Sequence, residues 1–204
     1  MQTSVVGVAG DRERTLYTRD GLRSIVFVGT YVPRRCGIAT FTADLTRAVT
    51  AASGDARVAV TALNDSPGGY EYPPEVAFEV NQNHLREYRL AADYLNVNRV
   101  DIVCVQHEYG IFGGPDGRHL LNLLGQLRMP VVTTLHTVLT QPSESQRAVV
   151  LELADLSDCL VVMSPRAMRY LQEIYQIPES RIRMIHHGIH DVPFIDPNFY
   201  KDQF

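Results

Sequence analysis

The chain contains only three cysteines, no long hydrophobic run and no large excess of either charge. Cys36, Cys104 and Cys159 are odd in number and widely spaced, a pattern that fits neither a disulfide framework nor a zinc ribbon. No apolar run approaches the roughly 20 residues of a membrane-spanning helix. The formal net charge of −4 provides no general attraction to nucleic acid or to an anionic membrane. We therefore predict a cytoplasmic protein with no nucleic-acid partner and no transmembrane segment.

Several sequence signatures of catalysis are also missing. The loop after the first predicted strand matches neither GxGxxG nor GxxxxGK[ST], which counts against nicotinamide cofactors and simple nucleotide hydrolysis. The pattern HExxH is absent, so a zinc site is disfavoured. The absence of a GxSxG elbow counts against an esterase. We expect neither a metal nor a cofactor.

What the sequence does contain is a regular alternation of continuous apolar runs and segments with helical periodicity. This alternation predicts an α/β fold with a mainly parallel sheet of about seven strands and helices on both faces. The predicted strands are residues 25–29, 57–63, 76–80, 101–106, 130–135, 159–163 and 182–185. The predicted helices are residues 40–52, 83–95, 116–127, 143–156 and 165–175.

Helix-capping residues and apolar faces refine these predictions. Asn83 can cap the second helix, Ser143 begins a capping box, and Ser164 precedes a proline at the first helical position. The first helix is expected to present one apolar face, formed by Phe41, Leu45, Ala48 and Val49. We interpret residues 1–23 as an N-terminal extension, 24–190 as the α/β domain and 191–204 as a linker.

Ligands of an open parallel sheet bind beyond the carboxyl ends of its strands, so residues that directly follow strands are the candidates. Gly37 follows the first strand and precedes a helix whose N-terminus could receive an anion. Arg34 and Arg35 in the same loop suit a phosphate. Alternatively, Gly37 is a plain turn residue and both arginines are solvated.

His107, Glu108 and Tyr109 follow the fourth strand, where polar side chains are unusual unless they line a cleft. We prefer a loop that binds a sugar or another acceptor, but nearby backbone could instead satisfy the histidine and the glutamate. His136 follows the fifth strand, and His187 and Gly188 follow the seventh. Each of these could be an ordinary structural residue. Together, at one edge of a sheet, they are more suggestive of a site.

These segments resemble the N-terminal half of a GT-B fold glycosyltransferase of family 4, a family of retaining enzymes that use nucleotide sugars. The resemblance extends over about residues 24–193. It depends on four segments of the sequence: Arg35-Cys-Gly-Ile-Ala-Thr-Phe-Thr-Ala-Asp44, Gln106-His-Glu-Tyr-Gly110, Leu135-His-Thr137 and Met184-Ile-His-His-Gly188.

The resemblance implies a Rossmann-like, three-layer domain that receives the acceptor. The partner domain of such enzymes binds the nucleotide sugar and carries a Glu-x7-Glu motif, which has no counterpart here, so we expect that domain to be absent and this chain alone to be inactive. The implied substrates are a nucleotide-sugar donor and a sugar, polyol or lipid-linked acceptor. The implied roles are catalytic for His136, donor-diphosphate binding for Gly37 and Ile38, acceptor binding for His107, Glu108 and Tyr109, and an interdomain cleft position for His187 and Gly188.

Two alternatives belong to other classes. One is a non-enzymatic binding module with a flavodoxin-like fold. The other is half of a different GT-B enzyme, such as a sugar-nucleotide 2-epimerase, for which Glu108 is the obvious acidic candidate. A half-enzyme should also expose the face that meets its partner domain, so we predict a homodimer through this face. Its candidate residues are Tyr109, Ile111, Phe112 and the residues after Ile189.

Overall fold

The computed structural model describes residues 21–188, and the predictions for the extension before Gly21 and for the linker 191–204 lie outside these residues. The described chain forms one sheet with the strand order β3-β2-β1-β4-β5-β6-β7, and every neighbouring pair of strands is parallel. The strands are β1 (Ser24–Gly29), β2 (Arg57–Asn64), β3 (Val76–Asn81), β4 (Ile102–His107), β5 (Val131–Leu135), β6 (Cys159–Val162) and β7 (Ile182–Met184). The predicted seven-stranded parallel sheet is confirmed.

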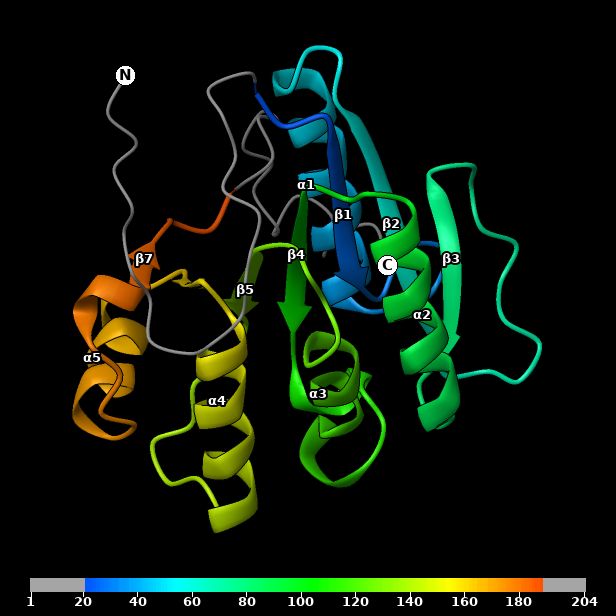
Figure 1. Ribbon diagram of the computed structural model, residues 1–204. Helices are drawn as coiled ribbons and strands as arrows, with labels where there is room; N and C mark the ends of the chain where they lie inside the picture. Colours follow the sequence, from blue (N-terminus) through cyan, green and yellow to red (C-terminus); the bar gives the residue numbers. More distant parts are fainter. Residues whose placement is uncertain (1–20, 189–204) are drawn as a thin grey trace, which may run out of the picture.

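Helices cover both faces of this sheet, but unequally. The α-helices are α1 (Gly37–Ala52), α2 (Leu85–Val97), α3 (His119–Leu124), α4 (Glu144–Leu156) and α5 (Pro165–Glu173). In Figure 1, α2, α3 and α4 lie in front of the sheet and α1 lies behind it. From β1, the chain passes through α1 to β2 and continues to β3 at one edge of the sheet. It then returns through α2 to β4 and adds β5, β6 and β7 towards the other edge. Because crossovers between parallel strands are right-handed, this reversal places α1 opposite the other helices.

The two faces bury separate apolar clusters. Val26 and Val28 of β1 point into the larger cluster, which includes residues of α2, α3, α4 and α5. Ile25 and Phe27 of the same strand point into the smaller cluster beside α1. A strand that is buried on both faces requires the continuous apolar run seen in the sequence. None of the helices between residues 21 and 188 has the length and apolar character needed to cross a bilayer.

Two of the predicted helix caps are confirmed. Ser143 and Gln146 form a reciprocal capping box at the start of α4. The side chain of Ser164 accepts a hydrogen bond from the backbone of Ala167, with Pro165 at the first helical position of α5. The predicted cap of α2 is displaced by one residue, because His84 and not Asn83 holds that position.

Two helices differ more from prediction. The third helix was expected over residues 116–127, but α3 is shorter and follows two 3-10 turns, η1 (Tyr109–Ile111) and η2 (Pro115–Gly117). Asp116 and Gly117 have positive φ angles, which are incompatible with continuing an α-helix. The first helix begins three residues earlier than expected, because the Cys36 sulfur accepts a hydrogen bond from the backbone of Ala39 and caps it.

Candidate functional site

The centre of the sheet is the point where the chain reverses direction. β1 and β4 are neighbours there, and the chain leaves them towards opposite edges. Gly29 at the end of β1 approaches β4 closely, since a side-chain carbon at this position would lie 3.1 Å from Cβ of Gln106. In open α/β sheets, the crevice for ligands lies outside the carboxyl ends of such a strand pair. The topology therefore predicts that the functional site lies beyond β1 and β4.

The alternation of side chains along β4 and β5 divides the candidate residues between the two faces of the sheet. Val103 and Val105 point into the larger cluster, whereas Cys104 packs against the smaller one. By the same period of two, His107 faces the larger cluster and Gln106 faces α1. His136, which directly follows β5, meets Gln106 on the α1 face.

His136 is fixed by two hydrogen bonds. Its ring Nε2 lies 3.0 Å from Oε1 of Gln106, and its backbone N–H donates to the carbonyl oxygen of His107 over 3.0 Å. Burial, with a smaller contribution from His187, lowers the pKa of His136 to about 4. The ring is therefore neutral near pH 7 and can act as a hydrogen-bonding group without a charge.

Phe41 of α1 brings His136 and His187 together. Its ring centroid lies 4.8 Å from that of His136 and 5.2 Å from that of His187, both in edge-to-face arrangements. Nδ1 of His187 lies 2.6 Å from the carbonyl oxygen of Gly188. The predicted residues after β5 and after β7 thus meet on the α1 face, where α1 supplies the aromatic ring between them.

Gly37 is the first residue of α1 and is exposed, whereas Ile38 is half-buried. A side-chain carbon built on Gly37 would meet no atom within 4 Å, so the space above this helix N-terminus is open. Open backbone N–H groups at a helix N-terminus are suited to an anion. The geometry is compatible with the predicted diphosphate position.

The two arginines of the β1–α1 loop have different environments. The side chain of Arg34 is only 10% exposed and forms an ion pair with Asp65 at 3.3 Å. Its guanidinium also donates to the backbone oxygen of Leu63 and to Oε1 of Gln82. Arg34 is therefore committed to joining the loop to the ends of β2 and β3, and it is not a free phosphate ligand. Arg35 is exposed.

Glu108 connects the loops that follow β4 and β5. One carboxylate oxygen accepts a hydrogen bond from the backbone of Tyr109 over 3.0 Å, and the other accepts one from the hydroxyl of Thr137 over 2.5 Å. The Tyr109 hydroxyl is buried and forms no hydrogen bond with any residue of the described chain. Burial, followed by the nearby Tyr175, raises the pKa of Tyr109. These contacts place Glu108 and Tyr109 beside the residues that follow β5.

His107 is the predicted site residue with the most unexpected environment. Its side chain is 0% exposed, stacks on Phe112 at 5.9 Å and meets Tyr109 edge-on at 5.2 Å. Neither ring nitrogen has a hydrogen-bond partner within residues 21–188. Burial, together with the nearby His136, lowers the pKa of His107 to about 3. The side chain therefore has no exposed surface with which to touch an acceptor in this structure.

Other features also differ from the sequence-based expectation. Ile111 and Phe112 are buried in the larger cluster, so they do not form the exposed face expected of them. Gln106 and Phe41 were not predicted as site residues. A buried polar residue at a strand end was the available signal for Gln106, whereas Phe41 looked like an ordinary apolar residue of a helix.

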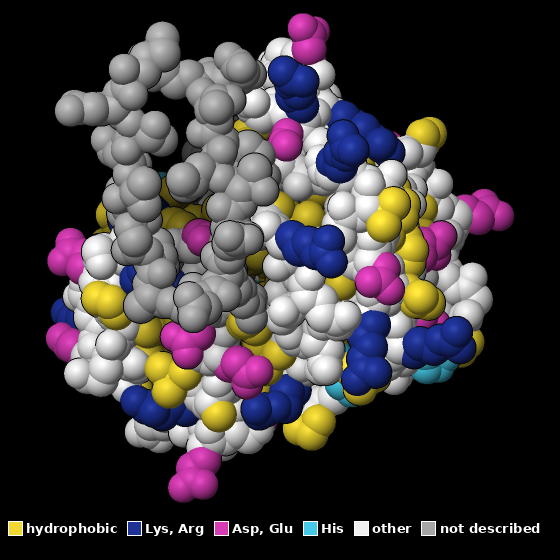
Figure 2. Space-filling model, viewed as in Figure 1, with side chains coloured by type: hydrophobic (Ala, Val, Ile, Leu, Met, Phe, Trp, Pro, Cys, Tyr) yellow, Lys and Arg dark blue, Asp and Glu magenta, His cyan; other side chains and the backbone are white. Residues whose placement is uncertain are grey.

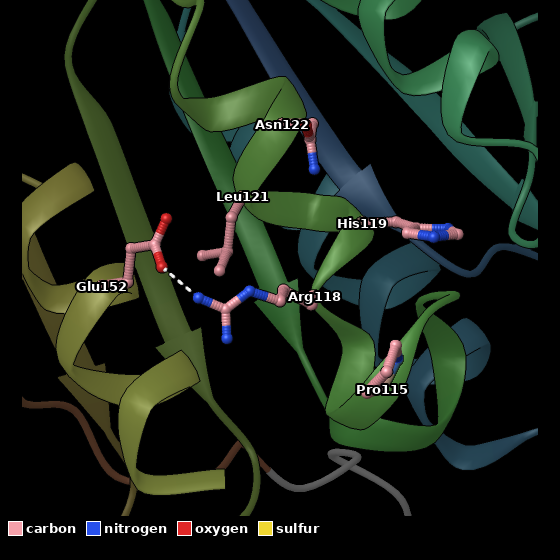
Figure 3. Close-up of a pocket in the computed structure, with 6 residues that line it drawn as sticks. All are labelled: Pro115, Arg118, His119, Leu121, Asn122 and Glu152. Atoms are coloured by element: carbon pink, nitrogen blue, oxygen red, sulfur yellow. Dashed lines mark hydrogen bonds and ion pairs between the residues drawn. The ribbon is translucent and has the colours of Figure 1, made fainter. Parts of the chain in front are cut away.

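One hollow of the described surface lies away from this cluster (Figure 3). Its volume is about 400 Å³, and it is found between α3 and α4, where Arg118 points towards Glu152 and forms an ion pair of 3.0 Å. A second hollow of about 230 Å³ lies at the carboxyl ends of β2 and β3. Neither hollow is lined by a predicted site residue.

Charge and metal-ligand chemistry add two observations. On the face drawn in Figure 2, outside the grey atoms, basic and acidic side chains are interspersed and form no large area of one sign. Among residues 21–188, no group of three or more His, Cys, Asp or Glu side chains could hold a metal ion. The groups described at the β1–β4 crevice include the neutral imidazole of His136, the amide of Gln106 and the carboxylate of Glu108.

The sequence is similar to a known protein family, and the fold is similar to a solved structure. The model of Glycosyltransferase Family 4 matches residues 36–191. A crystal structure of a glycosyltransferase from Rickettsia africae superimposes with a TM-score of 0.59 at 16% sequence identity, covering 89% of this chain and 48% of that chain. This chain thus spans about half the length of that structure. No curated protein matches the sequence.

Two dehydrogenase structures are more distant. The aldohexose dehydrogenase of Thermoplasma acidophilum has a TM-score of 0.38 at 10% identity, covering 78% of this chain and 75% of that chain. A short-chain dehydrogenase from Leptospira borgpetersenii has a TM-score of 0.36 at 10% identity, with coverages of 86% and 87%. Similarity at this level carries no argument about function.

Proposed function

Because this chain belongs to glycosyltransferase family 4, we propose that it is the acceptor-side half of a GT-B enzyme that transfers a hexose from a nucleotide sugar with retention. The single observation that carries this proposal is the cluster of Gln106, His136, Phe41 and His187 beyond the β1–β4 crevice. The family match favours a transferase over the flavodoxin-like module and the 2-epimerase.

The donor is proposed to lie over the N-terminus of α1. The open space above Gly37 leaves the first backbone N–H groups of the helix, including that of Ile38, accessible to the diphosphate. Arg35 is exposed in the same loop and could contribute charge. His136 would then lie near the transferred sugar, where a preorganised neutral ring can stabilise the transition state.

The acceptor is proposed to lie beside the loop after β4. Glu108 is half-buried and held by Thr137, so its carboxylate has a defined position from which to meet a hydroxyl group. Tyr109 completes this side. His107 is fully buried, so we propose that it supports the loop after β4 by packing against Tyr109 and Phe112. It does not contact the acceptor in this proposal. The acceptor is proposed to be a sugar, a polyol or a lipid-linked acceptor.

The partner that completes the site is proposed to be a nucleotide-sugar-binding domain, which would meet this one across His187 and Gly188. This chain covers 48% of the Rickettsia africae structure, so about half of that structure has no counterpart in this chain. A homodimer through the same face is a second proposed assembly. The 204-residue chain alone is expected to transfer no sugar.

Binding tests the assignment without the partner domain. UDP-glucose and GDP-mannose, titrated into the ¹⁵N-labelled chain, should shift the backbone amide resonances of Gly37 and Ile38. Methyl glycosides should shift those of Glu108 and Tyr109. Shifts confined to the hollow near Arg118 would contradict the proposed site.

Kinetics test the role of His136. In a protein that combines this chain with a nucleotide-sugar-binding domain, His136→Ala should lower kcat by about 10²–10³ and change the acceptor KM little, because the group acts in the transition state. Arg118→Ala, which removes an exposed ion pair away from the cluster, is the control and should keep its turnover. Unchanged turnover in His136→Ala would remove the proposed catalytic residue.

A further inference from the structure

Gln106 is a buried polar residue whose side-chain oxygen lies within hydrogen-bonding distance of one residue. It is 1% exposed, and its Oε1 lies 3.0 Å from Nε2 of His136. An amide oxygen can only accept a hydrogen bond, so Nε2 must carry the proton. In the neutral imidazole, the other nitrogen, Nδ1, then carries a lone pair.

The packing around Gln106 keeps this contact in place. Gly29 of β1 lies so close to the Gln106 side chain that even one added carbon would stand 3.1 Å from its Cβ. On the other side, Phe41 holds the His136 ring edge-on at 4.8 Å. Both partners of the hydrogen bond are therefore restrained by neighbouring elements, β1 for the amide and α1 for the imidazole.

Nδ1 is the nitrogen of the His136 ring that does not face Gln106. It makes no hydrogen bond with any residue of the described chain, yet it is not among the buried polar atoms that lack a partner. Both nitrogens of the neighbouring His107, by contrast, are buried and unpaired within residues 21–188. Nδ1 of His136 is therefore not fully buried, and the His136 ring that carries it lies beside Phe41, which also contacts His187.

We propose that Gln106 is a positioning residue that holds His136 in the Nε2–H tautomer, so that Nδ1 accepts a hydrogen bond from a hydroxyl group of the sugar. This inference rests on the proposed function and specifies the substrate chemistry of the same site. A lone pair selects hydroxyl donors, whereas phosphate oxygens are themselves acceptors and gain nothing from it. In this proposal, His136 binds the sugar, and the N-terminus of α1 binds the diphosphate.

The tautomer can be measured on the 204-residue chain by two-bond ¹H–¹⁵N correlation spectra of its histidine rings at neutral pH. His136→Gln identifies the His136 signals, and His84→Gln, an exposed histidine, is the matched control that should leave them in place. We expect Nε2 to resonate as a protonated nitrogen and Nδ1 as an unprotonated one. An Nδ1–H tautomer or a doubly protonated ring would overturn the inference.

Gln106→Glu tests the contact itself. The substitution keeps an oxygen at the same place and adds a negative charge, which stabilises the imidazolium. The pKa of His136 should rise from about 4 to about 6 or above, with His187 the other titratable group facing it across Phe41 and His107 behind it. An unchanged pKa in a folded variant would show that the two side chains do not interact. If this variant does not fold, the wild-type spectra still test the tautomer.

Two ligands test whether Nδ1 of His136 binds a sugar hydroxyl group or a phosphate group. Methyl α-D-glucopyranoside should shift the Nδ1 resonance of His136, whereas inorganic pyrophosphate should leave it unchanged. A shift with pyrophosphate alone would overturn the assignment of Nδ1 to a hydroxyl. The tautomer measurement needs no sugar, so its failure rejects the Gln106 contact, and failure of the donor titration at Gly37 rejects the proposed function separately.

Discussion

The buried imidazole of His107 should make the domain sensitive to mild acid. Its pKa is about 3 in the folded chain, against 6.5 for an ordinary histidine, because burial disfavours the charged ring. The folded pKa lies below the unfolded one, so the unfolded chain binds the proton first. The stability that this neutral ring represents is complete above about pH 6.5 and is lost progressively as the pH falls towards 3.

The size of the effect follows from the proton linkage. Between about pH 7.5 and about pH 5, one histidine that titrates only in the unfolded chain lowers the free energy of unfolding by about 2 kcal/mol. His136 acts in the same direction, with its pKa of about 4, but it is partly exposed and solvent screening reduces its share. His107 should therefore be the larger of the two contributions.

Urea denaturation followed by circular dichroism, repeated at the two pH values, measures this difference. Circular dichroism is the suitable probe because the chain has no tryptophan. His107→Leu should lose the part of the pH dependence that comes from this ring, about 2 kcal/mol. His186→Gln, at an exposed position, should keep the wild-type dependence. If His107→Leu and the wild type lose equal stability on acidification, the ring is not a buried neutral group and the argument fails.

Two further predictions concern the loop after β4 and the start of α4. Gly113→Ala would place a carbon against the backbone oxygen of Gln82 and should lower the free energy of unfolding by about 3 kcal/mol or more. In Gly110→Ala the added carbon meets no atom within 4 Å, so the loss should be below about 0.5 kcal/mol. Equal midpoints of the two variants in thermal denaturation would refute this contrast. Ser143→Ala removes the reciprocal cap with Gln146 and should lower the free energy of unfolding by about 1 kcal/mol in urea titrations; an unchanged value would show that the cap is not formed in solution.

The fold could be predicted because its signal is local. Each strand is a short apolar run and each helix has its own periodicity, so β1 or α4 can be recognised without knowing its neighbours. Helix α1 shows where this local signal fails. Of its expected apolar face, Leu45 and Val49 pack against the smaller cluster, whereas Ala48 is exposed. The fully buried residues are instead Ala39, Thr42, Ala43 and Thr46. The hydroxyls of both threonines donate to carbonyl oxygens one turn back, so these polar residues can face the sheet at little cost.

The candidate site was only partly predictable for a related reason. Counting residues after each strand identifies His136 and His187, and the period of two places Gln106 and His107 on opposite faces. Neither signal shows which of these faces α1 covers, because that depends on the strand order, which is a long-range property. The burial of His107 beneath Phe112 could not be inferred from neighbouring residues in the sequence.

The pairing of β1 with β4 also affects the order in which the chain folds. Strands β1 to β3 and strands β4 to β7 each pair with strands close in sequence, and within the described residues β1–β4 is the one strand pair that joins the two groups. Its formation brings together residues as distant as Ser24 and Asp101, whose carboxylate accepts a hydrogen bond from the Ser24 backbone. Closing so long a loop is entropically costly and slow. We therefore expect the two groups of strands to form first, and the crevice to be the last part of the domain to assemble.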